Sequence, residues 1–529
     1  MSALRSVWFR RFASIGLPAI SFVIVGCMWA FASPPGSSAD DGFHMTSIWC
    51  AWGESETCVE DSWAGTVSVP DRVAKPSCFA LGLTPNARCT LLLTGDLVPT
   101  TDVNRDNSYN PRIFYLTLRS FVGPDAARSV LVIRFFNVAL AAGLLGFALA
   151  VSRPAIRRAL ALGWAVAIIP VGMFTIASTN PSSWAIIGVG VFWAFLYTFL
   201  TEHPWRSPRA LWALLGAVLS TVVALGGRSD PIYMILLSVI AVVLMAAPRL
   251  RQRMRQAWPV LVAAAVAVVG IVVISWNTRA GSIVKMASQM QFPTGDYIRD
   301  QPNAVLKTLA EFPSFFAAMF GGQAPSWTQR TTGFDGGTPG YTWTGYTYGM
   351  GYTDLIMPSL VGVMAMACVG AIVLIGFTSY SWRKFVAVGL LSVGLVAEIL
   401  FLRALYGFQQ AIAALQPRYF FPLVLLIICF SVVAYPGSRR LLNRGQTVML
   451  ILVLALVNGV ALRATIARYV HGQAHSWTAI GNESGWWWPS GPSPDLLSLL
   501  GTLAGLLWFA SVLALANRSG VSERERVSA

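Results

Sequence analysis

The chain has 529 residues, of which 55% are hydrophobic and 12% are charged, and its mean hydropathy is +0.61. This composition excludes an ordinary soluble domain, because the apolar residues are gathered in runs of about 16 to 22, long enough to cross a bilayer as helices. The net charge of +15 does not indicate a nucleic-acid partner, since the arginines cluster in short connections between the apolar runs. The sequence therefore predicts an all-α polytopic membrane protein.

Residues 1–32 are expected to form a cytoplasmic N-terminus and the first transmembrane helix. Three arginines precede an apolar run at residues 15–32, a pattern typical of an uncleaved signal anchor. A cleaved signal peptide is the alternative, because residues 30–33 have the small side chains of a cleavage site.

The next segment, residues 33–127, is predicted to be an extracytoplasmic loop that opens with two adjacent carboxylates. A proline and a glycine end the first helix, so Asp40 and Asp41 should lie just past the lipid boundary. His44 comes three residues after Asp41, and on a helix it would share a face with that acid. The alternative is a solvated helix end followed by an ordinary loop histidine.

The same loop contains four of the seven cysteines of the chain, Cys50, Cys58, Cys78 and Cys89. Outside the cytoplasm such thiols can oxidise, and two disulfides would brace a segment with little apolar core. A zinc site is the alternative, but the spacings are not CxxC pairs and no histidine follows at ligand distance. We expect disulfides, with Cys50–Cys58 and Cys78–Cys89 as the most local of the three possible pairings.

The remaining apolar runs predict transmembrane helices 2–7 in residues 128–276 and helices 8–12 in residues 356–516. Arginine-rich connections alternate with tight turns rich in serine, glycine and proline, which indicates antiparallel hairpins with the arginines in the cytoplasm. Residues 277–355 form a second long extracytoplasmic loop, and residues 517–529 form a cytoplasmic tail. The prediction is a multi-pass protein of the plasma membrane with both termini cytoplasmic and about twelve spans, at residues 15–32, 130–151, 160–177, 184–200, 211–225, 232–247, 260–275, 356–377, 385–402, 419–434, 448–462 and 496–516.

Several short stretches over about residues 33–422 carry a resemblance to a known family. They are Pro34-Pro35-Gly36, Asp40-Asp41, His44, Ser47-Ile48-Trp49-Cys50, Asn110-Pro111, Tyr115, Arg134, Asn137, Asn180-Pro181-Ser182-Ser183-Trp184, Gly227-Arg228-Ser229-Asp230, Gly351-Tyr352-Thr353-Asp354, Met357-Pro358 and Gln416-Pro417-Arg418-Tyr419. These stretches resemble the actinobacterial branch of the membrane proteins called domain of unknown function 2142. That family is similar in layout to the GT-C glycosyltransferases, whose first outer loop carries one or two acidic residues directly after the first span. The resemblance implies a GT-C-like fold and an enzyme that uses a polyprenyl-phosphate sugar as donor and a cell-envelope glycan or a lipid-linked molecule as acceptor.

Two departures from the family patterns accompany this resemblance. Many relatives have Asp-Glu where this chain has Asp40 and Asp41. The soluble C-terminal domain that some GT-C enzymes carry is missing here, which leaves acceptor binding without an assigned part of the chain.

Sugar transfer with inversion needs a base near the acceptor hydroxyl and positive charge near the departing phosphate. Asp40 or Asp41 could be the base, and the neighbouring acid could orient the acceptor or help to bind a divalent cation, Mg²⁺ or Mn²⁺. His44 could bind the metal or shuttle a proton. No other cofactor is indicated.

Four arginines are candidates for the phosphate, because they fall at or slightly inside the outer ends of the predicted spans, where burying a charge is costly. A guanidinium suits a phosphate well, since it donates in a fork. The alternative is structural pairing, of Arg228 with Asp230 or of Arg403 with Glu398. The candidate substrate-binding residues are Arg134, Arg228, Arg403, Arg418, Tyr109 and Asn180.

Two other functions compete with the glycosyltransferase. A transporter or flippase of lipid-linked glycans would usually show repeated halves and polar residues at the bilayer midplane, whereas the charges here crowd the outer boundary and no repeat is visible. A non-catalytic protein of envelope assembly is the third hypothesis, and the acidic pair argues against it.

Overall fold

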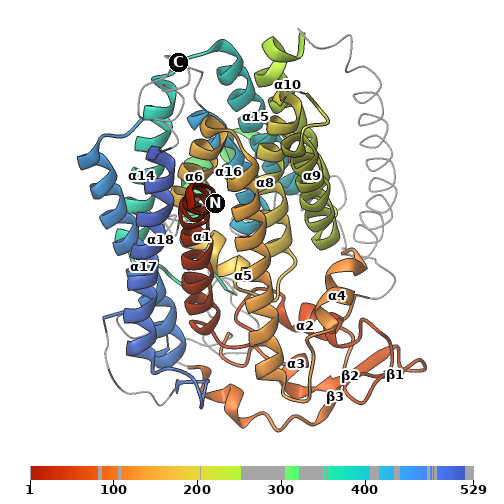
Figure 1. Cartoon of the computed structure of the whole chain (residues 1–529). Coiled ribbons are helices and arrows are strands. Elements are labelled where there is room, and N and C mark those ends of the chain that lie inside the picture. Colours follow the sequence, from red (N-terminus) through yellow and green to blue (C-terminus); the bar gives the residue numbers. More distant parts are fainter. Residues whose placement is uncertain are drawn as a thin grey trace.

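Long apolar runs form a bundle of helices that dominates the structure, a computed structural model (Figure 1). The segment between the first two long helices folds separately at one end of the bundle. The structure describes residues 2–80, 86–104, 110–202, 204–251, 304–320, 350–351, 355–405, 416–433, 441–472, 477–478, 481 and 485–518.

Within these residues, eight helices are long and apolar enough to cross a membrane. The chain is therefore a multi-pass membrane protein in type, as its composition predicts. The eight helices are α5 (Ala126–Val151), α8 (Ser182–Thr201), α9 (Pro208–Gly227), α10 (Pro231–Arg251), α14 (Ser359–Phe377), α15 (Trp382–Leu405), α17 (Arg444–His471) and α18 (Pro494–Arg518).

Two further helices contribute shorter apolar stretches, α1 (Ser2–Phe31) and α16 (Phe421–Val432). Helix α1 packs between α5 and α18, and Ser21 and Trp29 form hydrogen bonds inside the bundle. The indole of Trp29 donates to Asn458 Oδ1 on α17 at 2.9 Å. The span expected at residues 260–275 lies outside the described residues, and the count of twelve is not reproduced by the described helices.

One expected span, residues 160–177, is a broken helix. Helix α6 (Pro154–Ala167) stops, and the short helix α7 (Val171–Ile176) follows after a turn that contains Pro170. Proline has no backbone N–H and its ring excludes the preceding helical turn, so the ladder of hydrogen bonds cannot run through this position. The hydropathy of the segment could not reveal this, because the residues around the break are buried and apolar on both sides.

The segment 33–125, here called the loop domain, has a small apolar core that it shares with residues of α5 and α8. It contains the helices α2 (Asp41–Trp49), α3 (Asp71–Ala74) and α4 (Arg112–Arg119), the 3₁₀-helix η1 (Ala87–Leu92), and an antiparallel sheet of order β1-β2-β3 (Val59–Asp61, Thr66–Pro70, Leu97–Thr100). The expectation of an all-α chain missed this sheet. Its central strand alternates, with Val67 and Val69 buried and the residues between them half-buried, as a one-sided sheet requires.

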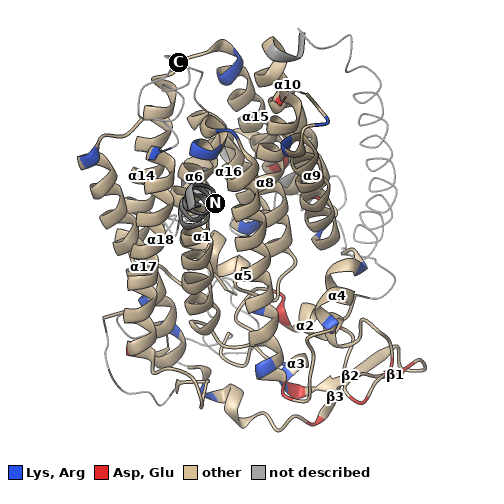
Figure 2. Ribbon diagram, viewed as in Figure 1, with Lys and Arg blue, Asp and Glu red and all other residues tan. Residues whose placement is uncertain are grey.

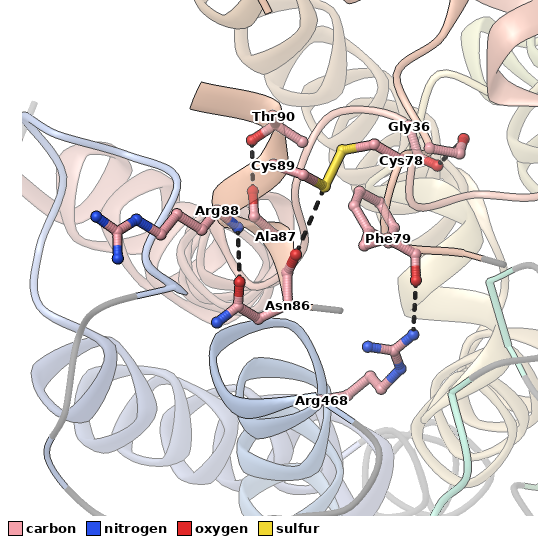
Figure 3. Close-up of a disulfide and its surroundings, with 10 residues drawn as sticks. Gly36, Cys78, Phe79, Asn86, Ala87, Arg88, Cys89, Thr90 and Arg468 are labelled. Carbon is pink, nitrogen blue, oxygen red and sulfur yellow. Dashed lines mark hydrogen bonds between the residues drawn. A yellow bond between two sulfur atoms is a disulfide. The ribbon is translucent and has the colours of Figure 1, made fainter. Parts of the chain in front are cut away.

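Both predicted disulfides are present, Cys50–Cys58 and Cys78–Cys89. The second one closes a short segment that bridges the loop domain and the helical bundle, as Figure 3 shows. Within this segment the carbonyl of Phe79 accepts from Arg468 Nη2 of α17 at 3.2 Å. Just before it, Ser77 Oγ donates to the carbonyl of Gly36 at 2.8 Å. The disulfide thus lies between the last helices and the start of the loop domain.

The two ends of the bundle differ in charge (Figure 2). Basic residues mark several of the turns that lie away from the loop domain, whereas the loop-domain end carries basic and acidic residues together. At the turns away from the loop domain, Glu202 pairs with Arg153 at 3.0 Å and with Arg209 at 3.6 Å, which joins two of these turns. Helix α1 runs toward the loop domain and α18 runs away from it.

Candidate functional site

The site is built on the acidic turn, residues 33–41, which connects α1 to α2. Gly36 has a φ of 82°, and a Cβ there would lie 2.5 Å from Pro76 Cβ, so the position requires glycine. Asp40 has a φ of 62° and is the one non-glycine residue with positive φ in the described part of the chain. Such a conformation costs free energy and is concentrated at functional sites. The turn therefore holds Asp40 in a defined orientation at the N-terminus of α2.

Asp40 forms an ion pair with Arg418. The two residues lie near opposite ends of residues 33–422, the stretch that resembles the family. Oδ2 of Asp40 accepts from Arg418 Nη2 at 2.7 Å, with the Asp40 side chain 56% exposed and that of Arg418 only 7% exposed. Desolvation by the surrounding protein opposes the charge, but Arg418 holds the pKa of the Asp40 carboxyl below its usual value. Asp40 is therefore an accessible carboxylate that stays ionised at neutral pH.

Asp41 is buried, and its two oxygens are both occupied. Oδ1 accepts from the hydroxyl of Thr179 at 2.6 Å, and Oδ2 accepts from the backbone N–H of Ser38 at 3.0 Å. Burial raises the pKa of this carboxyl, with the nearby charge of Arg134 acting in the opposite direction. Asp41 holds the acidic turn against the turn between α7 and α8. Asn180 does the same, since its Nδ2 donates to the carbonyl of Ala39 at 2.9 Å.

Arg134 has a different surrounding from the one expected for a phosphate ligand. Its guanidinium, fully buried in α5, donates to the carbonyls of Ala30, Ser33 and Pro34 at 2.7 to 2.9 Å, and to Ser37 Oγ at 3.3 Å. These carbonyls are left over where α1 ends, and an arginine fork can satisfy several at once. Arg134 caps the helix that leads into the acidic turn and has no exposed surface for a ligand.

Arg228 shows the structural pairing that the sequence left open. Its Nε donates to Asp230 at 2.7 Å, and its Nη1 donates to Ser182 Oγ at 3.3 Å. Its guanidinium also lies over the ring of Tyr419, 4.4 Å from the centroid. Arg418 lies 5.0 Å from the centroid of the same ring, so this tyrosine joins the two arginines of the site.

His44 is buried at 5% exposure on the first turns of α2. Its Nδ1 lies 3.0 Å from the hydroxyl of Tyr115, which in turn accepts from Asn110 Nδ2 at 3.3 Å. Burial lowers the pKa of His44 to about 3, although Asp40 acts in the opposite direction. The imidazole is therefore neutral across the physiological range.

A small pocket opens beside Arg418. Its lining combines apolar side chains of α7 and of two other segments with polar side chains around Arg418. An apolar chain next to an anionic group would fit such a mixed lining. Nε of Arg418 is buried without a hydrogen-bond partner among the described residues. The lining residues are Ser38, Val171, Phe174, Thr175, Met350, Gly351, Gln416, Pro417 and Arg418.

The residues present do not fit a divalent cation. Asp40 is directed to Arg418 and Asp41 to Thr179 and Ser38, so the two carboxylates do not converge on one point. No group of three histidine, cysteine, aspartate or glutamate side chains lies together in the part of the chain that is described. We derive no step through a metal.

The structure thus brings together six of the predicted site residues. Three come from the start of α2 and the residue before it, and the others come from the turns before α8, α10 and α16. The six are Asp40, Asp41, His44, Asn180, Arg228 and Arg418. Arg403 lies on α15, but its side chain is outside the described part of the structure, as is Tyr109. Thr179, Tyr115 and Tyr419 were missed. Tyr115 and Tyr419 lie inside stretches that resemble the family, at Asn110 to Tyr115 and Gln416 to Tyr419. This position in the sequence could have identified them as site residues.

Residues 22–427 match the model of a family described as predicted membrane protein (DUF2142). The chain belongs to this family. No curated protein and no solved structure matches the chain. Every site residue named above lies inside the region matched by the DUF2142 model, while α17 and α18 follow it. The family description supports a membrane protein and leaves its activity open.

Proposed function

We propose that this DUF2142 protein is a glycosyltransferase that moves a sugar from a polyprenyl-phosphate donor to an extracytoplasmic glycan acceptor, with Asp40 as general base. The observation that carries the proposal is the pair of Asp40 and Arg418. It combines an exposed, ionised carboxylate with a buried guanidinium at the edge of an apolar pocket. A base and a phosphate-binding cation are the two parts that inverting transfer needs.

In the proposed step, the acceptor hydroxyl oxygen forms a bond to the anomeric carbon while the bond from that carbon to the phosphate oxygen breaks. The electron pair of the broken bond leaves on the lipid phosphate, and the hydroxyl proton goes to the carboxylate of Asp40. Because the Asp40 side chain is 56% exposed, it can release the proton to water afterwards. Arg418 lies where it can bind the phosphate, and Tyr419 stacks against that guanidinium.

The membrane pocket supports a lipid-linked donor over a soluble nucleotide sugar. Part of its apolar lining comes from α7, the short helix that follows the break after α6. Val171 and Phe174 line this pocket together with Arg418, so a prenyl chain could lie along them. The proposal also includes residues 277–355 as an extracytoplasmic loop and a reaction in the cell envelope, because the acceptor must reach Asp40 from outside the cell.

A transporter of lipid-linked glycans is the second candidate, and the broken helix α6–α7 is the observation that favours it. Discontinuous helices often form substrate sites in transporters. The break here is buried beside the acidic turn at one end of the bundle. This position suits a surface reaction better than passage across the midplane.

The test is complementation of a strain that lacks the gene, scored by analysis of its envelope glycans. Asp40→Asn keeps the shape of the side chain and removes the base, so we expect glycan transfer to fall by about 10²- to 10⁴-fold. Glu60→Gln, an exposed acid on β1 of the same domain, is the matched control and should complement fully. Immunoblots of membranes establish equal levels. Full complementation by Asp40→Asn would exclude the catalytic role and favour the transporter or an assembly protein.

A further inference from the structure

The proposed reaction leaves the chain of hydrogen bonds at His44 without a role. Asn110 Nδ2 donates to the Tyr115 hydroxyl oxygen, which lies 3.0 Å from His44 Nδ1. Since the hydroxyl oxygen already accepts the amide hydrogen, the hydroxyl hydrogen is available to Nδ1. Nδ1 is then an acceptor, and the neutral ring carries its hydrogen on Nε2.

The groups around the ring keep it neutral. Three charged side chains act on His44 from other elements, namely Asp40 before α2, Arg418 before α16 and Arg228 after α9. Asp40 favours an imidazolium, while the two arginines and burial disfavour it. Tyr115 is itself buried, and its pKa is raised by burial, so its hydroxyl keeps its hydrogen.

We propose that Tyr115 and Asn110 fix His44 as a neutral hydrogen-bond donor, with Nε2–H available to an oxygen atom of the substrate, and that His44 does not shuttle protons. The hydrogen bond between His44 and Tyr115 is made through Nδ1, which leaves Nε2 as the nitrogen that can face a ligand. The presence of a substrate oxygen rests on the proposed function. The tautomer itself does not, because it follows from the contacts of Tyr115 and Asn110.

Nitrogen NMR of the full chain in lipid nanodiscs, labelled with ¹⁵N-histidine, tests the tautomer without any assay of activity. His44→Gln identifies the His44 signals by their loss. We expect the neutral Nε2–H form, unchanged between about pH 5 and about pH 8. Tyr380→Phe, an exposed tyrosine between α14 and α15, is the control and should leave the spectrum as it is. An imidazolium or an Nδ1–H ring in the wild-type protein would overturn the proposal.

Asn110→Asp offers a sharper test, because it should reverse the chain of hydrogen bonds. A carboxylate can only accept, so Tyr115 would donate to it and would accept from Nδ1–H. We therefore expect the Asn110→Asp variant to show the Nδ1–H tautomer. A spectrum that keeps the wild-type tautomer in this folded variant would show that Tyr115 does not direct the ring.

The donor role has its own readout in the complementation assay. His44→Gln keeps a neutral N–H donor and should retain most of the transfer, whereas His44→Leu should lose at least about 10-fold. Equal transfer in the leucine variant and the wild type would overturn the donor role. If the wild-type protein itself shows no transfer, the proposed function fails, and the tautomer spectrum still decides this inference.

Discussion

Asp40 and Asp41 are neighbours in the chain, but they lie in different surroundings and are suited to different roles. The exposed Asp40 meets one guanidinium, while the buried Asp41 accepts from a hydroxyl and a backbone N–H. Between them the backbone passes from the positive φ of Asp40 into the first residue of α2. We therefore assign the chemistry to Asp40 and the positioning of the turn to Asp41.

The stability of the protein should depend on Asp41 in a graded way. Asp41→Ala leaves the N–H of Ser38 and the hydroxyl of Thr179 without an acceptor, which should cost about 2 kcal/mol or more. Asp41→Asn keeps one acceptor oxygen and should cost less. Thermal unfolding in detergent can rank the two variants against the wild type. A result in which both variants unfold at the wild-type temperature would remove Asp41 from the framework of the turn.

The pH dependence of transfer should report the pair of Asp40 and Arg418. Asp40 works as a base only when ionised, and its lowered pKa keeps it ionised well into the acid range. Arg418→Leu removes the main charge that lowers this pKa, so the acid limb of the rate profile should move to higher pH. Arg112→Leu, on the exposed side of α4, is the control and should leave the limb in place. An unmoved limb in Arg418→Leu would argue against Asp40 as the titrating base.

Much of this residue-level arrangement could be anticipated, and the rest depends on contacts between distant segments. The position of the acids after the first helix followed from local signals, namely a proline, a glycine and the end of an apolar run. The roles of Arg134 and Arg418 did not, since both are arginines near outer helix ends. Only the fold shows that one meets helix carbonyls and the other meets Asp40.

At the scale of elements, the site is held between the helical bundle and the loop domain. Arg134 on α5 caps α1 from one side, and Pro76 and Ser77 contact Gly36 from the other. Long apolar runs predicted the helices, and the most local pairing of the four loop cysteines predicted the two disulfides. Sequence periodicity missed the three short strands and the break before α7, because strands of three to five residues and a buried break carry little periodic signal.

The Cys78–Cys89 disulfide should stabilise the framework around the acidic turn. A double change to serine removes a closed segment that contacts Arg468 of α17, and it should cost the loop domain about 2 to 4 kcal/mol. Limited proteolysis and thermal unfolding can measure this loss. Cys27→Ser, a free cysteine of α1, is the control and should have little effect. An unaltered protease pattern in the double variant would show that the disulfide does not brace this region.

At the scale of the whole molecule, the basic turns and the loop domain lie at opposite ends of the bundle (Figure 2). From the positive-inside rule we propose an orientation with the loop domain outside the cell. Helices α9 and α15 begin at the end of the bundle with the basic turns and run toward the loop domain. All the elements that form the site would then meet at the outer surface.

Cysteine labelling in intact cells can test this orientation. Ser62→Cys, at the exposed tip between β1 and β2, should react with a membrane-impermeant maleimide added outside. Tyr380→Cys, between α14 and α15, should react only after the cells are opened. The reverse pattern would place Asp40 in the cytoplasm and would end the proposal of an extracytoplasmic reaction.

The ion pair of Asp40 and Arg418 has a consequence for biosynthesis, because the two residues are 378 positions apart. At about 5 to 20 residues per second, Asp40 leaves the ribosome roughly 20 to 75 seconds before its partner exists. Arg468, which contacts Phe79, is made later still. A chain that stops before Arg418 lacks the guanidinium that pairs with Asp40, although Arg134 is already present to contact the acidic turn. Catalysis would thus begin only when nearly the whole protein has been inserted into the membrane, and unfinished chains would be inactive.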